Sequence, residues 1–201
     1  ALTKGTFGDL SESFERQRHE VMKDQDRITQ SDFFNRSIWN PDRSSVQSRS
    51  SVRRTFDPNT TRLTAAVEIA PDLNTVWNGV SFTELMNRQP DLVALFRGIF
   101  PGVSLTEGPG TRTIVQDALG NHSITYVQTG YLVMKDRALQ EETKTFSATL
   151  NFDRSRNAAL QRVGYRYDPA TTELVEAREL LVPLREIFRT PDGTVVNRES
   201  D

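Results

Sequence analysis

Residues 145–152 read TFSATLNF and carry the clearest structural signal in the chain. Apolar and polar side chains alternate along this stretch, which is the period of a β-strand with one buried face. Phe146, Ala148, Leu150 and Phe152 are expected on the buried side. The stretch therefore predicts an antiparallel sheet with its other face in water.

Similar strand signals recur on both sides of this segment. The expected strands are residues 63–69, 114–115, 124–133 with a possible bulge at Gly130, 160–167 before Asp168-Pro169, and a hairpin over 184–198. Residues 172–181 fit either a strand or a helix. We therefore expect five to seven largely antiparallel strands.

Two short helices are predicted between the first of these strands and the next. Ser81 followed three residues later by Glu84 forms a capping box. Pro90 suits the first turn of a second helix, which Pro101-Gly102 would end. The fold class predicted is α+β, a largely antiparallel curled sheet or small β-barrel with a helical pair, preceded by a helical and extended N-terminal arm.

We expect residues 1–60 to form this arm and residues 61–201 to form the α+β domain. A helix is predicted over residues 9–30, because Asp9 and Glu12 resemble a capping box. Its apolar residues form a narrow strip, namely Phe7, Leu10, Phe14, Val21 and Ile28. Such a strip is too thin to hold a helix on a core. It fits a helix lying on its own domain or a surface that docks onto another subunit.

The rest of the arm divides into two segments. Residues 33–39 are an aromatic anchor with Phe33, Phe34, Ile38 and Trp39, which need burial against this domain or a partner. Residues 42–54 are an Arg/Ser-rich tether that should not fold alone. Its arginines, which are candidates for contacts with a partner, are Arg43, Arg49, Arg53 and Arg54.

No catalytic or metal-binding motif stands out. The chain has no cysteine and only two histidines. His122 has Ser123 beside it and Asp117 nearby, but neighbouring strand residues point to opposite faces, so they do not suit a catalytic pair. Acidic residues around Glu142 and Glu176 read as solvated surface. We predict that the protein is not an enzyme and has no catalytic residues, no metal site and no cofactor.

The net charge of −2 gives no strong field for nucleic acid, so that partner is unlikely, and no apolar run is long enough to span a membrane. The expected location is the cytoplasm, or an assembled particle such as a virion.

The function predicted is a non-enzymatic structural or assembly subunit of a larger complex, such as a virion or tail component. It would dock through its arm onto other protein subunits, in many copies or in a hetero-assembly. The alternative is a ligand-binding β-barrel with an aromatic-lined interior, whose candidate residues are Tyr126, Tyr131, Phe146, Phe152, Tyr165 and Tyr167.

Overall fold

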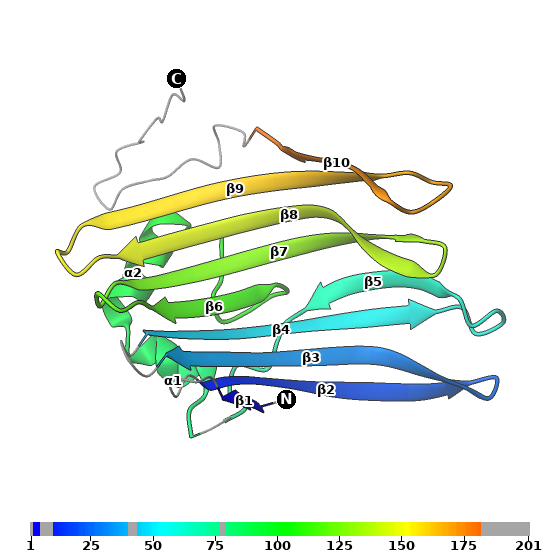
Figure 1. The fold of residues 1–201 in the computed structure, drawn as a ribbon, viewed down its shortest axis with the longest axis horizontal. Coiled ribbons are helices and arrows are strands. Elements are labelled where there is room, and N and C mark those ends of the chain that lie inside the picture. The colour runs from blue at the N-terminus through cyan, green and yellow to red at the C-terminus, as the bar shows by residue number, and fades with distance from the viewer. Residues whose placement is uncertain (1, 5–9, 40–43, 77–78, 182–201) are drawn as a thin grey trace.

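Ten antiparallel strands make one large sheet in the computed structural model, which describes residues 2–4, 10–39, 44–76 and 79–181 (Figure 1). The strands are β1 (Leu2–Lys4), β2 (Leu10–Met22), β3 (Gln25–Trp39), β4 (Ser44–Phe56), β5 (Leu63–Ile69), β6 (Thr111–Gln116), β7 (His122–Met134), β8 (Arg137–Leu150), β9 (Arg156–Tyr167) and β10 (Leu174–Glu179). Every pairing between them is antiparallel.

The sheet splits at β4. One half of β4 pairs with β6 and the other half pairs with β5, so that the order along the sheet is β1-β2-β3-β4-β6-β7-β8-β9-β10 with β5 beside β4. Strand β6 begins at Thr111, opposite Val127 of β7. Beyond that point β7 runs past β5 without pairing to it (Figure 1). Because β1 and β10 are the two ends of this order, the sheet formed by the described residues is open.

Two helices cover one end of one face of this sheet (Figure 1). Helix α1 spans Phe82–Asn87, and the Ser81 hydroxyl caps it by accepting a hydrogen bond from the Glu84 N–H. Helix α2 spans Pro90–Ile99 and packs on β7 and β8. Both helices and the capping residue are as predicted, because the signals for them are local.

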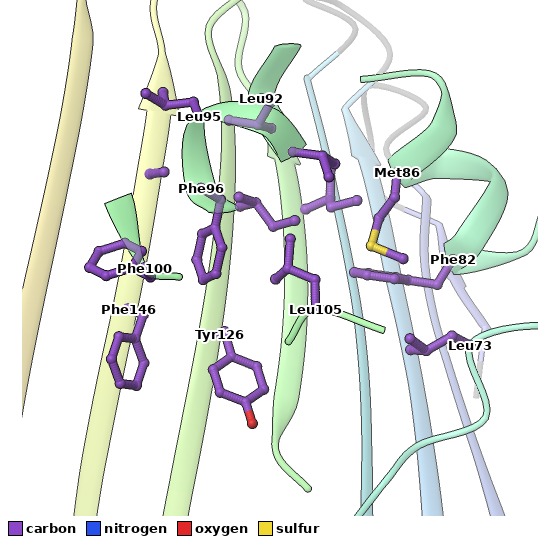
Figure 2. Packing of buried hydrophobic residues seen from close by; sticks show 14 residues of the cluster. Leu73, Phe82, Met86, Leu92, Leu95, Phe96, Phe100, Leu105, Tyr126 and Phe146 are labelled. Atoms are coloured by element: carbon purple, nitrogen blue, oxygen red, sulfur yellow. The ribbon is translucent and has the colours of Figure 1, made fainter. Parts of the chain in front are cut away.

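The hydrophobic core lies between these helices and the sheet. Phe96 and Phe100 meet Phe146 from β8 and Tyr126 from β7, as Figure 2 shows. The ring centroids of Phe100 and Phe146 are 5.4 Å apart in an edge-to-face arrangement. The helices therefore define an inner face of the sheet, and the side chains that alternate with the core residues point to an outer face.

Several strand predictions are confirmed. Residues 63–69 form β5, the register shifts at Gly130 as a bulge would require, and β9 ends at Tyr167 before Asp168-Pro169. Residues 174–179 are a strand, which settles the open choice for that segment. The architecture is mostly β, which corrects the predicted α+β class, because residues 10–22 and 25–39 are strands and only two short helices occur among the described residues. The predicted hairpin over 184–198 lies outside the described residues.

The helix predicted over residues 9–30 is wrong. Residues 10–22 form β2 and residues 25–30 begin β3, joined by a two-residue turn in which Lys23 and Asp24 have φ angles of 48° and 61°. Leu10 and Phe14 are four residues apart, a spacing that puts two side chains on one face of a strand as well as of a helix. The spacing therefore did not distinguish the two structures.

The tether predicted over residues 42–54 is also corrected, since Ser44–Phe56 form β4 in the interior of the sheet. The aromatic anchor, residues 33–39, belongs to β3. The backbone N–H and C=O groups of β4 form hydrogen bonds with β3, β5 and β6. These bonds stabilise a strand that has few apolar side chains to bury. The predicted boundary between residues 60 and 61 thus lies between two strands, β4 and β5, that pair with each other.

A barrel with an aromatic interior is not what the described strands form. Tyr126 and Phe146 are core residues under α2, with 2% and 8% of their surface exposed. Phe152 lies beyond the end of β8 and is 80% exposed. The aromatic residues therefore do not converge on one enclosed space.

Candidate docking surface

The outer face of the sheet is built largely from small hydroxyl side chains. Residues paired directly across antiparallel strands point to the same side of a sheet. One such row crosses six strands and consists of Ser13, Asn35, Ser48, Thr113, Thr125 and Ser147. The next residues along β7 and β8, Tyr126 and Phe146, point into the core. The row therefore points away from the helices.

Two more rows flank this one at the strand period of two residues. The first row ends on β9 at Ala159. One flanking row consists of Ser11, Ser37, Val46, Val115, Ser123, Thr149 and Asn157, and the other of Phe33, Ser50, Thr111, Val127, Thr145 and Gln161. We call these three rows the uncharged face. Glu15 pairs with Phe33 at the β2 end of one row and marks the start of a charged rim.

The uncharged face contains no Lys, Arg, Asp or Glu, although these residues make up 26% of the chain. None of its side chains is buried, and within the described part of the chain no helix covers it (Figure 1). Two contacts tie its strands together: the Ser11 and Ser37 hydroxyl oxygens are 3.1 Å apart, and the Asn35 amide donates to the Ser48 hydroxyl at 3.4 Å. Surfaces depleted of charge are typical of the centre of protein interfaces.

Two charged residues that cross the middle of the sheet, Arg49 of β4 and Arg112 of β6, lie instead on the inner face. Arg112 is fully buried and donates to the backbone carbonyls of Ser104, Leu105, Glu107, Gly108 and Gly110 at 2.5 to 3.4 Å. This arginine therefore holds the loop that leads into β6 and has a structural role.

Arg49 is the neighbour of Arg112 in this inner row. Its guanidinium carbon lies 4.8 Å from the centre of the Phe34 ring, and its Nη1 donates to the Ser48 carbonyl at 3.1 Å. Burial lowers the pKa of the Arg49 guanidinium to about 10, and Asp72 opposes this shift. Arg49 therefore remains charged at neutral pH and is part of the fold.

A third buried charge, Asp32, is matched by donors on three sides. Its carboxylate accepts from Arg16 Nε at 2.9 Å, from Gln30 at 3.0 Å and from the Ser51 hydroxyl at 2.7 Å. Burial alone would raise the pKa of Asp32, but these hydrogen bonds and the Arg16 charge lower it below its ordinary value. The charged network stabilises β2, β3 and β4 against one another.

The structure divides the predicted interface residues of the arm between the two faces. On the inner face lie Leu10, Phe14, Phe34, Ile38, Arg49 and Arg53. The Phe14 and Phe34 rings meet at 5.7 Å between centroids, while Phe34 and Arg49 are only 2% and 1% exposed. Phe34 of the predicted aromatic anchor and Arg49 of the predicted tether therefore pack within the protein's own fold. For Phe34 this is burial against its own domain, one of the two possibilities left open by the sequence.

The other predicted interface residues are scattered. Phe33 and Trp39 are on the outer side of β3, and Trp39 is 41% exposed. Arg54 donates to the Ser31 hydroxyl at 3.0 Å. Val21 and Ile28 lie near the far turn of the β2–β3 hairpin, where Val21 is 73% exposed. Phe7 and Arg43 lie outside the described residues.

Sequence reasoning missed the hydroxyl residues of the uncharged face. Residues 44–50 read SSVQSRS, in which Val46, Ser48 and Ser50 alternate with the buried Gln47 and Arg49. That alternation was the available signal. It was obscured because the alternating buried positions hold Gln47 and Arg49 instead of apolar residues.

His122 and Ser123 point to opposite faces, as expected for neighbouring strand residues. The Asp117 carboxylate accepts hydrogen bonds from the backbone of Leu119 and from Asn121, so it organises the turn between β6 and β7. Among the described residues, no cluster of His, Asp or Glu has the arrangement of a metal site, and no helix is long and apolar enough to cross a membrane.

Comparison with known proteins gives no relative. No protein-family model, no curated protein and no solved structure matches the chain.

Proposed function

We propose that this chain is a structural subunit of a larger protein assembly, and that it docks by stacking its uncharged face against the same face of a second copy. The observation that carries the proposal is the absence of charge across three rows of outward side chains. Strands β2, β3 and β4 supply part of this face. The N-terminal segment therefore contributes to docking. Of the interface residues predicted from the sequence, however, only Phe33 belongs to the uncharged face.

The chemistry of the face suits a partner identical to itself. A charged side chain loses its hydration when a partner covers it, and two copies of a charged face also repel each other. The uncharged face carries neither cost. A Ser or Thr hydroxyl is both a donor and an acceptor, so two such faces can satisfy each other in a symmetric contact.

The size of the face agrees with a reversible contact. Seven strands about 4.8 Å apart and about five residues of about 3.3 Å each cover ~600 Å². Two faces would bury ~1,200 Å² in total, which is near the lower limit for specific interfaces. We therefore expect self-association that depends on protein concentration.

The test is a charge placed in the middle of the face. Thr125 lies in the central row on β7, and Thr125→Arg would bring two like charges together at the centre of a symmetric dimer. Val76→Arg is the matched control, because Val76 is 63% exposed and lies outside the sheet. Sedimentation equilibrium over a wide range of protein concentration measures the mass of each species.

We expect the unaltered protein and Val76→Arg to approach the mass of a dimer, and Thr125→Arg to stay monomeric with an unchanged circular dichroism spectrum. Mixing Thr125→Arg with Thr125→Glu should restore association. A protein that is monomeric at every concentration would overturn the proposal, as would dimerisation of Thr125→Arg at the strength of the unaltered chain.

A further inference from the structure

A second feature, on the inner face and independent of the docking proposal, is a cleft of about 720 Å³ at the helix-covered end of the sheet. Its floor is a row of directly paired residues, His122, Leu150 and Arg156, on β7, β8 and β9. Ala94, Leu95, Gly98 and Asp91 of α2 line the opposite wall. The volume is within the range of small-molecule sites.

The end of the cleft is formed by two turns that are fixed to each other. The Phe152 N–H donates to the Asn121 side-chain oxygen at 2.8 Å, which joins the β8–β9 turn to the β6–β7 turn. A Cβ on Gly120 would lie 4.0 Å from the Phe152 ring. The ring of Phe152 is thus held beside the cleft, and 80% of the residue's surface is exposed to a ligand there.

The polar groups of the cleft are mainly hydrogen-bond donors. Arg154 and Arg156 are exposed, and among the described residues neither guanidinium has a carboxylate within ion-pair distance. The His122 Nδ1 atom is buried and has no hydrogen-bond partner there. With Asp91 as the one acidic residue, two guanidiniums leave the cleft with a net positive charge.

The apolar side chain of Leu150 in the floor, an exposed aromatic ring and two guanidiniums without a carboxylate partner line this cleft. Apolar pockets with a few convergent polar groups are the usual form of small-ligand sites, and arginine recognises planar carboxylates and phosphates through paired hydrogen bonds. Gly98 and Gly120 line the cleft without a side chain to fill it. A Cβ placed on Gly98 would have no atom within 4 Å.

We propose that this cleft binds a small aromatic anion. The flat ring of the ligand lies against Phe152 and the floor at Leu150, and its carboxylate or phosphate is bound by Arg154 and Arg156. Arg154 lies in the β8–β9 turn with Phe152, and Arg156 begins β9, so the ring and both guanidiniums come from one short segment of the cleft wall.

The probe is 2-naphthoate, titrated into the full chain by calorimetry, with 2-naphthalenemethanol as its uncharged counterpart and inorganic phosphate as the anion without a ring. Hydrogen bonds to a charged group contribute about 1.5 to 3 kcal/mol, or roughly tenfold or more in affinity. We expect one saturable site for 2-naphthoate, binding at least about tenfold tighter than the alcohol, and no competition by phosphate at equal concentration.

Two variants and one control locate the site. Arg154→Gln combined with Arg156→Gln should weaken 2-naphthoate by about tenfold or more and leave the alcohol unchanged, whereas Phe152→Ser should weaken both. Arg62→Gln is the control, since Arg62 is exposed and does not line the cleft. All four substitutions in these three variants are at exposed positions, so the melting temperature should stay the same.

Three results would each overturn the proposal. The first is the absence of saturable 2-naphthoate binding. The second is equal affinity for 2-naphthoate and the alcohol. The third is a loss of affinity in Arg62→Gln as large as that in the double arginine variant, which would show binding to the general surface charge of the protein.

Discussion

Arg49 and Arg112 are paired directly across β4 and β6, and both side chains are buried, with 1% and 0% of their surface exposed. Two like charges in register are normally unfavourable. Here each guanidinium lies over an aromatic ring, with Arg49 over Phe34 and Arg112 over Tyr126, both at 4.8 Å. Such contacts attract a desolvated cation. The centre of the sheet is therefore held by arginine and aromatic side chains as well as by aliphatic packing.

Replacing Arg112 with methionine should strongly destabilise the protein. The variant retains much of the volume but leaves the carbonyls of Ser104, Leu105, Glu107, Gly108 and Gly110 without their common donor. Hydrogen bonds to a charged group contribute about 1.5 to 3 kcal/mol each, so losing several of them should cost about 3 kcal/mol or more. Urea unfolding of Arg112→Met and of Arg62→Met, an exposed control, measures the difference. A loss below about 0.5 kcal/mol, the range of surface changes, would contradict the structural role.

Asp32 should make the protein less stable in acid. Because its folded pKa lies below the ordinary value of 3.8, ionised Asp32 stabilises the fold above that pH, and this stabilisation is lost as the pH falls through the folded value. Asp32→Asn should cost about 2 kcal/mol at neutral pH through weaker hydrogen bonds with Arg16 and Ser51. The difference between the two proteins should shrink in acid. An unfolding difference that is constant with pH would show that Asp32 is not ionised in the fold.

The contribution of Glu68 to stability should depend on pH in the opposite direction to that of Asp32. Its carboxylate accepts a hydrogen bond from the Thr129 N–H at 2.7 Å, where β7 passes β5 without pairing. Burial raises the pKa of Glu68 above its ordinary value of 4.5, and the Thr129 hydrogen bonds only partly offset this. The stabilising contribution of the protonated form is complete below pH 4.5 and is lost as the pH rises through the folded value.

Glu68→Gln therefore should raise the free energy of unfolding at neutral pH, since glutamine keeps an acceptor for Thr129 without the buried charge. The gain should disappear below pH 4.5. Thermal unfolding at several pH values tests this, with Glu141→Gln as the exposed control. Destabilisation by Glu68→Gln at neutral pH would mean that the carboxylate charge itself holds the two strands.

The sequence predicted the elements whose signals are local. Ser81 and Glu84 cap α1, Pro90 begins α2, and the alternation through Phe146 and Ala148 marks β8. These residues fit a simple pattern of buried apolar and exposed polar positions. The helical pair and the strands that it covers could therefore be placed without the structure.

The first three long strands could not be predicted in this way. In β4 the buried positions include Gln47, Arg49 and Ser51, and their burial depends on β3, β5, β6 and the inner-face packing. A buried arginine looks like an exposed one until its partners are known. The uncharged face was hidden for a related reason: Ser48, Thr113 and Thr125 become neighbours only through pairing between distant segments.

Two turns with the same sequence give a further prediction. Lys23-Asp24 joins β2 to β3 and Lys135-Asp136 joins β7 to β8, and all four residues have positive φ angles. Glycine adopts this backbone conformation without strain, and two-residue hairpin turns favour it at the second position. Asp24→Gly should therefore stabilise the protein by about 0.5 to 1 kcal/mol.

Asp136→Gly should behave differently, although the turn has the same sequence and geometry. The Asp136 side chain accepts a hydrogen bond from the Leu63 N–H at 2.9 Å and so ties the β7–β8 turn to the start of β5. Losing that bond costs about 1 kcal/mol, which cancels or exceeds the relief of backbone strain. Thermal and urea unfolding of the two variants side by side measure the contrast. If both variants gain equally, Asp136 does not hold β5; if Asp24→Gly loses stability, residues 22–25 do not form the hairpin turn.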